Sequence, residues 1–219
     1  MLPMADEQSD AGRSSKRLQD LIEISARLFR AKGYAATSMQ EIAREAGMLK
    51  GSLYHHIGTK EDLLWLISKP TLSELVSGVR EILEDSRLPL ITRLRQGMRV
   101  HVRRFHSHDT FMAVVAQEGI NALNAGRHAE LVRLQKEYFE LWQTLFRKGI
   151  RSGEIDASLN PAIMSYAVLG MVNWMLRWYD RDGALKPDEI ADQFARLLID
   201  GFQPSKPPKV RGVTPSSSG

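Results

Sequence analysis

Two glycines, Gly33 and Gly47, divide the amino-terminal part of the chain into short segments with helical periodicity. Within residues 18–29 the apolar residues recur with the spacing of one buried helix face. Ser38 and Glu41 have capping-box spacing, which predicts the start of a second helix. Because glycine commonly ends helices, we expect the first helix to end at Gly33 and the second at Gly47.

A third short helix fits residues 49–56, with Leu49 and Leu53 expected to face inward. Thr59 is placed to cap a long fourth helix that begins at Lys60. The amino-terminal part of the chain therefore predicts one longer helix followed by two short ones, with a long helix leading away from them.

The same pattern continues to the carboxyl end, and no run of alternating residues demands a strand. Pro70 is expected to kink or split the fourth helix. Further helices are predicted at residues 89–106, 110–123, 127–151, 161–180 and 187–202. The predicted fold is all-α, with three amino-terminal helices followed by a larger helical bundle. The expected boundaries are a disordered arm at 1–12, the first domain at 13–60, the second at 61–203 and a flexible tail at 204–219.

Two short helices joined by a glycine turn and steadied by a longer one form a helix-turn-helix unit, whose second helix enters the major groove of DNA. The outer face of that helix is expected to hydrogen-bond to base edges and phosphates. The predicted DNA contacts are Thr37, Ser38, Gln40, Lys50, Gly51, Ser52, Tyr54, His55, His56 and Lys60. A structural helical hairpin with a polar surface is the alternative interpretation.

Positive charge is concentrated in this part of the chain. Residues 11–60 contain nine Lys/Arg and four Asp/Glu, a balance of +5, whereas the whole chain of 219 residues has a net charge of +4. A basic module on a nearly neutral body favours a polyanionic partner such as double-stranded DNA. Charge alone leaves an ordinary solvated surface as the alternative.

Residues 17–67 resemble the DNA-binding domain of TetR-family transcriptional regulators. The matching stretches are LFRAKGYAATSMQEIAREAG and KGSLYHHIGTKEDL. Two positions depart from the family pattern. Leu49 stands where the family often has a capping Ser or Thr, so a cap and a phosphate contact are lost, and Ile57 replaces the more usual phenylalanine. The resemblance implies a repressor that binds a palindromic operator and is released by a small-molecule effector.

The resemblance also implies a homodimer, in which the last two helices pair with those of a second copy. Residues 161–179 are apolar almost all the way round, so this helix must be covered on more than one side. The expected dimer residues are Met164, Val168, Met175, Phe194, Leu197 and Leu198. Burial inside a single chain is the alternative.

The carboxy-terminal half resembles more narrowly a branch of the family that regulates lipid, steroid and branched-acid breakdown, several members of which respond to acyl-CoA thioesters. This resemblance rests on LWQTLFRKGIRSGEID and NWMLRWYDRDGALKPDEIADQF. An acyl-CoA needs an apolar slot and cationic groups for its phosphates. The expected ligand residues are Tyr138, Trp142, Met171 and Trp174 for the slot and Arg103, Arg104 and Arg177 for the phosphates. Each also has a structural interpretation, as core or as a solvated helix end.

HVRRFHSHDTF, residues 101–111, supports two alternatives, a metal site and an all-helical enzyme that uses residues 101–109. His101 and His108 are seven residues apart and could share a helix face. The sequence contains no cysteine ligand, and a basic surface patch is the better interpretation, with no metal, no cofactor and no catalytic residue. A third alternative is a small-molecule sensor that acts through protein partners.

The absence of cysteine favours a cytoplasmic location. The first ten residues lack the pattern of a secretory signal. The uncharged stretch at residues 162–176 is shorter than the roughly 20 residues that a membrane-spanning helix needs. We therefore expect no membrane partner.

Overall fold

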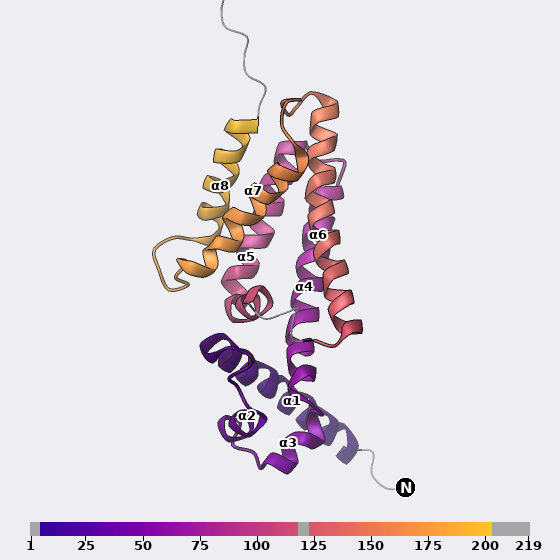
Figure 1. Ribbon diagram of the computed structural model, residues 1–219, viewed down its shortest axis with the longest axis vertical. Helices are drawn as coiled ribbons and strands as arrows, with labels where there is room; N and C mark the ends of the chain where they lie inside the picture. Colours follow the sequence, from indigo (N-terminus) through magenta and orange to yellow (C-terminus); the bar gives the residue numbers. More distant parts are fainter. Residues whose placement is uncertain (1–4, 118–122, 203–219) are drawn as a thin grey trace, which may run out of the picture.

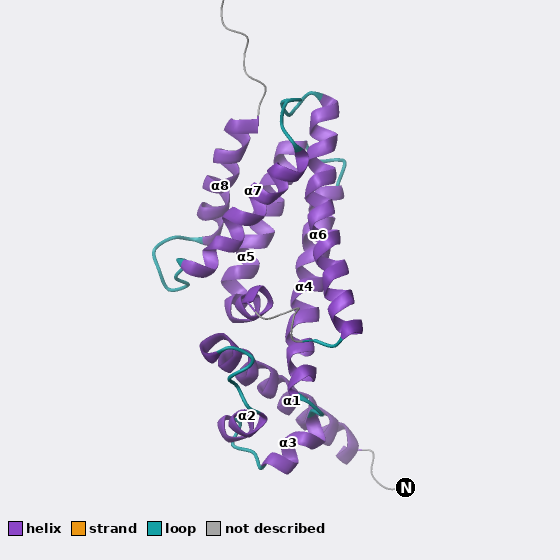
Figure 2. Ribbon diagram, in the orientation of Figure 1, coloured by secondary structure: helices purple, strands orange, loops and turns teal. Residues whose placement is uncertain are grey.

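The computed structural model describes residues 5–117 and 123–202. Every regular element in these two ranges is helical, and Figure 2 shows no strand among them. The elements are α1 (Ala5–Lys32), α2 (Met39–Glu45), α3 (Lys50–His56), α4 (Lys60–Glu84), α5 (Leu90–Gln117), α6 (Ala125–Ser152), α7 (Pro161–Asn173), the 3-10 helix η1 (Trp174–Arg177) and α8 (Pro187–Phe202). The all-α prediction is confirmed.

The first three helices form a small unit at one end of the molecule, below the helical bundle in Figure 1. Its core includes the fully buried side chains of Phe29, Ile42 and Leu53, one from each helix. Gly33 and Gly47 follow α1 and α2 with φ of 85° and 61°, a left-handed conformation that favours glycine. The predicted helix ends in this unit therefore arise from local backbone chemistry.

Helix α4 leaves this unit and runs into the bundle, where it packs against α5 and α6 (Figure 1). It continues through Pro70, so the expected split is wrong. Proline removes only one helical hydrogen bond, the one to the carbonyl of Leu66. Leu64, Ile67 and Leu72 are buried on both sides of the proline, and this packing holds the helix together.

One predicted boundary differs from the structure. Residues 5–12, expected to be a disordered arm, form the first turns of α1. The sequence there contains no proline, and its Ala, Glu and Gln residues favour helix. The tail predicted at 204–219 and the first four residues of the arm lie outside the described residues.

Three of the predicted helices have different limits. The pair predicted at 89–106 and 110–123 is a single helix, α5, as far as Gln117. Ser107 does not interrupt it, because its hydroxyl donates to the carbonyl of Arg103 at 2.6 Å inside the helix. The helix predicted at 161–180 stops at Asn173 and tightens into η1. None of the described helices is long and apolar enough to cross a bilayer.

Candidate nucleic-acid interface and effector site

Helix α3 lies at the free end of the molecule, with one side on the core and the other in solvent (Figure 1). Leu53 anchors it as a fully buried side chain. On α2, the hydroxyl of Ser38 accepts a hydrogen bond from the amide of Glu41 at 3.1 Å. Seven of the predicted DNA contacts are exposed on α3 and at the start of α2, and we call this set the α3 face: Ser38, Gln40, Lys50, Gly51, Ser52, Tyr54 and His55.

Two of the predicted DNA contacts also form hydrogen bonds within the protein. Thr37 is buried, and its hydroxyl donates to the carbonyl of Gly33 at 2.9 Å. The Nζ of Lys60 donates to the carbonyls of Tyr34 and Thr37, each at 2.8 Å, and lies 4.3 Å from the centre of the Tyr34 ring. The turn between α1 and α2 leaves carbonyls without helical donors, and Lys60 satisfies them. Lys60 is thus engaged with protein carbonyls, its pairing with a phosphate stays a prediction, and His56 is half-buried at the edge of the face.

Leu49 does not face inward as predicted. Its side chain is 83% exposed, although Leu53, one turn later, is fully buried. Leu49 is the N-cap residue of α3, with φ −69° and ψ 144°, and it forms no side-chain cap hydrogen bond. The helical spacing that predicts burial does not hold there, because the chain is extended and the helix begins only at Lys50.

A shallow hollow of about 620 Å³ lies between α2 and α3 on this side of the molecule. Its walls combine Ser38, Gln40 and Arg44 of the α2 region with Leu49 and Lys50 at the start of α3. Arg44 and Lys50 are exposed cations of the lining, and Glu41 contributes a carboxylate that pairs with Lys32 and Arg44.

In the bundle, Tyr138 and Trp142 of α6 are core residues. Trp142 is fully buried, and its ring lies edge-on to that of Tyr138 with centroids 6.4 Å apart. The Tyr138 hydroxyl lies 2.7 Å from Nδ1 of His101, which is also buried. Burial lowers the pKa of His101 to about 3 and raises the pKa of Tyr138, because both charged forms would lose their hydration. These three residues place polar groups within an apolar interior.

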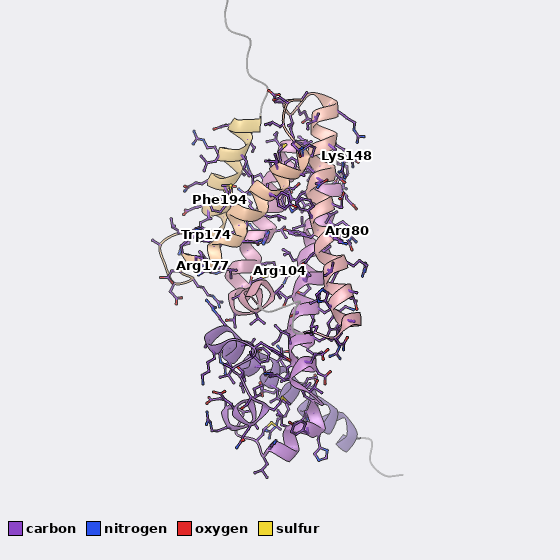
Figure 3. The ribbon with its side chains drawn as sticks, viewed as in Figure 1. Arg80, Arg104, Lys148, Trp174, Arg177 and Phe194 are labelled. Carbon is purple, nitrogen blue, oxygen red and sulfur yellow. The ribbon has the colours of Figure 1, made fainter. Side chains whose placement is uncertain are left out.

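The predicted phosphate-binding arginines are engaged with protein groups. Arg103 forms two hydrogen bonds with Asp188 of α8, both at 2.6 Å, and Arg104 lies 2.7 Å from Glu74 of α4. Arg177 stacks over the exposed ring of Trp174 at 5.8 Å. Figure 3 shows Trp174 and Arg177 together at the outer edge of the bundle, apart from Arg104.

The predicted ligand residues therefore occupy three environments: the core, the helix interfaces and the outer surface. Met171, half-buried on α7, lies between the core and the surface. The sequence prediction brought together residues that the fold separates, because composition indicates suitable chemistry but not position.

The predicted dimer residues fall on two sides of their helices. Met164, Val168 and Met175 are buried in the core of their own chain, as is Leu198, which favours the alternative of burial inside a single chain for these four residues. Phe194 is half-buried and Leu197 is 68% exposed. The outward side of α7 carries two side chains that the sequence prediction missed, Ile163 at 67% and Tyr166 at 66% exposure. Periodicity could not distinguish the sides, because α7 is apolar almost all the way round.

The histidines of the 101–111 segment are dispersed. His101 faces the core, whereas Nδ1 of His106 lies 2.6 Å from the hydroxyl of Tyr179. The side chain of His108 lies outside the described residues. Among the side chains that are described, no group of three His, Asp or Glu residues could hold a metal ion.

Sequence reasoning missed one connection between the two parts of the molecule. Asp62 closes the capping box of α4 with Thr59, and its second oxygen accepts a hydrogen bond from Arg127 of α6 at 2.8 Å. The Arg127 guanidinium holds the pKa of the Asp62 carboxyl below its usual value. The capping spacing signals the role of Asp62, but nothing in the sequence near Arg127 indicates its partner 65 positions away.

Comparison with known families agrees with this arrangement. Residues 21–65 match the model of bacterial regulatory proteins of the tetR family, and residues 88–202 match that of the tetracyclin repressor-like C-terminal domain. The chain belongs to the tetR family. The regulator is 30% identical over 201 residues to the HTH-type transcriptional repressor KstR2 of Rhodococcus jostii, covering 91% of this chain and 96% of that one.

Two solved structures extend the comparison. The ketosteroid transcriptional regulator KstR2 of Mycobacterium tuberculosis shares the fold of this tetR-family regulator with a TM-score of 0.81, at 23% identity over 86% of this chain and 96% of that one. AibR in complex with isovaleryl coenzyme A and operator DNA has a TM-score of 0.73 at 30% identity, covering 84% of this chain and 98% of that one.

Proposed function

We propose that this regulator is a cytoplasmic transcriptional repressor that binds a palindromic operator through the α3 face. The observation that carries the proposal is the exposure of Lys50, Ser52, Tyr54 and His55 on a helix whose opposite side is held by Leu53. A short helix with one buried anchor and an outer row of donors fits the major groove. The positive charge of residues 11–60 adds attraction to phosphates.

The proposed repressor acts as a homodimer through the outward faces of α7 and α8. Ile163, Tyr166 and Leu197 are each about two-thirds exposed, an unfavourable state for large apolar side chains unless a partner covers them. One short recognition helix makes too few base contacts for a specific site, whereas two helices on a palindrome double them. A second copy of the chain is the partner that satisfies both requirements.

The proposed effector is an acyl-CoA thioester that binds in the carboxy-terminal domain. One relative supports this class: AibR was solved in complex with isovaleryl coenzyme A and operator DNA. Within the bundle, His101, Tyr138 and Trp142 offer polar groups in an apolar environment, the combination that small-molecule sites use to orient a ligand.

The test of this function has two steps. The purified protein is first used to enrich duplexes from a randomised library, and an inverted repeat should emerge. Binding to that duplex is then measured with acyl-CoA thioesters, free CoA and the matching free acids. The proposal predicts release by thioesters, and a ligand at about 100 times its Kd should raise the free energy of unfolding by roughly 2.7 kcal/mol. Enrichment of no duplex would contradict the DNA-binding function, whereas release by none of the thioesters would contradict only the effector class.

A further inference from the structure

Leu49 has no evident role within its own chain. It is 83% exposed, more than Leu197 or Ile163, the exposed side chains of the proposed dimer surface. It also does not cap the helix that it precedes. At the start of α2, α4, α6 and α7, the corresponding residue is Ser38, Thr59, Asn124 or Asn160, and each accepts a hydrogen bond from a backbone amide.

The surroundings of Leu49 indicate what kind of surface it fits. The hollow beside it is lined by the polar and charged residues Ser38, Gln40, Glu41, Arg44 and Lys50, and by the apolar residues Ala43 and Met48. Ala43 is buried and Met48 is half-buried, and the Glu41 carboxylate pairs with Lys32 and Arg44. A protein-binding patch is formed by several adjacent exposed apolar side chains, whereas here Leu49 is the one exposed apolar side chain of the lining. The complementary surface therefore has one apolar feature among hydrogen-bond acceptors and negative charge.

The major groove of duplex DNA is such a surface. Its floor carries the acceptors of guanine and adenine, its walls carry phosphates, and its one apolar group is the C5 methyl of thymine. Leu49 immediately precedes Lys50 and Gly51 of the α3 face, so a duplex that contacts this face also covers Leu49. An exposed leucine at this position is then matched by a methyl group on the base.

We propose that Leu49 contacts the C5 methyl of a thymine in each half of the operator and thereby sets a preference for thymine at that position. This inference rests on the proposed DNA-binding function and deepens it, because it assigns sequence specificity to a residue that makes no hydrogen bond. The contact is apolar and removes both the leucine side chain and the methyl group from water.

The test replaces thymine by deoxyuridine, which differs only in the missing methyl group. Each thymine of the duplex enriched by the wild-type protein is replaced in turn, in both half-sites, and Kd is measured. Removal of one buried methyl group corresponds to about 0.8 kcal/mol, so we expect a loss of about four-fold for one half-site and about sixteen-fold for both. The loss should occur at one thymine position in each half-site and vanish in Leu49→Ala.

Two further variants distinguish loss of the proposed contact between Leu49 and thymine from a loss of protein stability. Leu185→Ala removes another exposed leucine, far along the chain in the loop before α8, and should keep the deoxyuridine effect unchanged. Leu49→Ser supplies a capping hydroxyl to α3, so it should lose the deoxyuridine effect while its thermal stability stays at or above that of wild type. Thymine and deoxyuridine duplexes that bind equally well to wild type would overturn the inference, as would a deoxyuridine effect that persists in Leu49→Ala and Leu49→Ser. Failure to enrich any duplex would instead overturn the DNA-binding function on which the inference rests.

Discussion

Arg127 donates to Asp62 at 2.8 Å and thereby ties the first turn of α6 to the first turn of α4. The connection is reinforced beside it, where Glu61 accepts a hydrogen bond from the amide of Asn124 at 3.0 Å. Helix α4 begins four residues after α3 ends, so Arg127, with the carboxylates of Asp62 and Glu61, joins the start of α6 to the segment that follows α3. We expect a displacement of α6 to reach the end of α3 through these contacts.

Replacement of Arg127 by alanine should weaken this transmission. We expect the ratio of operator Kd with and without an effective thioester to fall toward one, while the free energy of unfolding falls by only about 0.2–1 kcal/mol, because the pair is partly exposed. Arg133→Ala, which removes a more exposed pair on the same helix, is the matched control. An unchanged ratio in Arg127→Ala would show that the signal takes another route.

Lys60 should contribute more than Lys50 to the free energy of unfolding. Lys60→Met removes the ammonium that binds the carbonyls of Tyr34 and Thr37, and it should lower the free energy of unfolding by about 1–3 kcal/mol. Lys50→Met, on the exposed α3 face, should change it by less than about 0.5 kcal/mol. Chemical denaturation of the two variants measures the difference, and equal losses would refute the structural role of Lys60.

The outward faces of α7 and α8 should control the oligomeric state. Leu197→Asp places a charge where the proposed partner covers an apolar side chain, and we expect the mass in solution to halve. Leu185→Asp, at an exposed leucine outside that face, should leave the mass unchanged. Light scattering after gel filtration measures both. A dimer that persists in Leu197→Asp would place the interface elsewhere.

Mild acid should destabilise the bundle through His101. The pKa of His101 is about 3 in the folded protein and near 6.5 when it is not perturbed, so the unfolded chain takes up the proton first as pH falls. The free energy of unfolding is therefore retained above about pH 6.5. Below that pH, and down to about pH 3, it decreases by roughly 1.4 kcal/mol per pH unit. Denaturation between pH 7 and pH 5 should show this slope in wild type and in the exposed control His55→Gln. The slope should be lost in His101→Gln, and a slope that survives there belongs to another group.

The sequence predicted those features that depend on neighbouring residues. Ser38 and Thr59 start α2 and α4 as capping residues, and Gly33 and Gly47 follow the helices that they were expected to end. These signals are local because the hydrogen bonds join residues three or four positions apart. The exposed face of α3 follows from the same periodicity once Leu53 is placed in the core.

Features that depend on distant partners could not be predicted. Nothing near Lys60 indicates that its ammonium binds carbonyls more than twenty positions earlier. On α7, Val168 and Ile163 are equally apolar in the sequence, yet only the position of α5 and α6 buries the first and leaves the second exposed. The carboxylate partner of Arg103, Asp188, lies 85 positions away, so the sequence around Arg103 does not reveal that its guanidinium is already paired.

The central claim is that the α3 face binds DNA with sequence preference. The most direct test compares Lys50→Ala with wild type on the enriched duplex and on a random duplex of the same length. If Lys50 contacts a base, the free energy of binding to the enriched duplex should weaken by about 1–3 kcal/mol in Lys50→Ala, while binding to the random duplex changes little. Lys148→Ala, which removes an exposed lysine of the bundle, should alter neither. Equal affinity of wild type and Lys50→Ala for the enriched duplex would contradict the account.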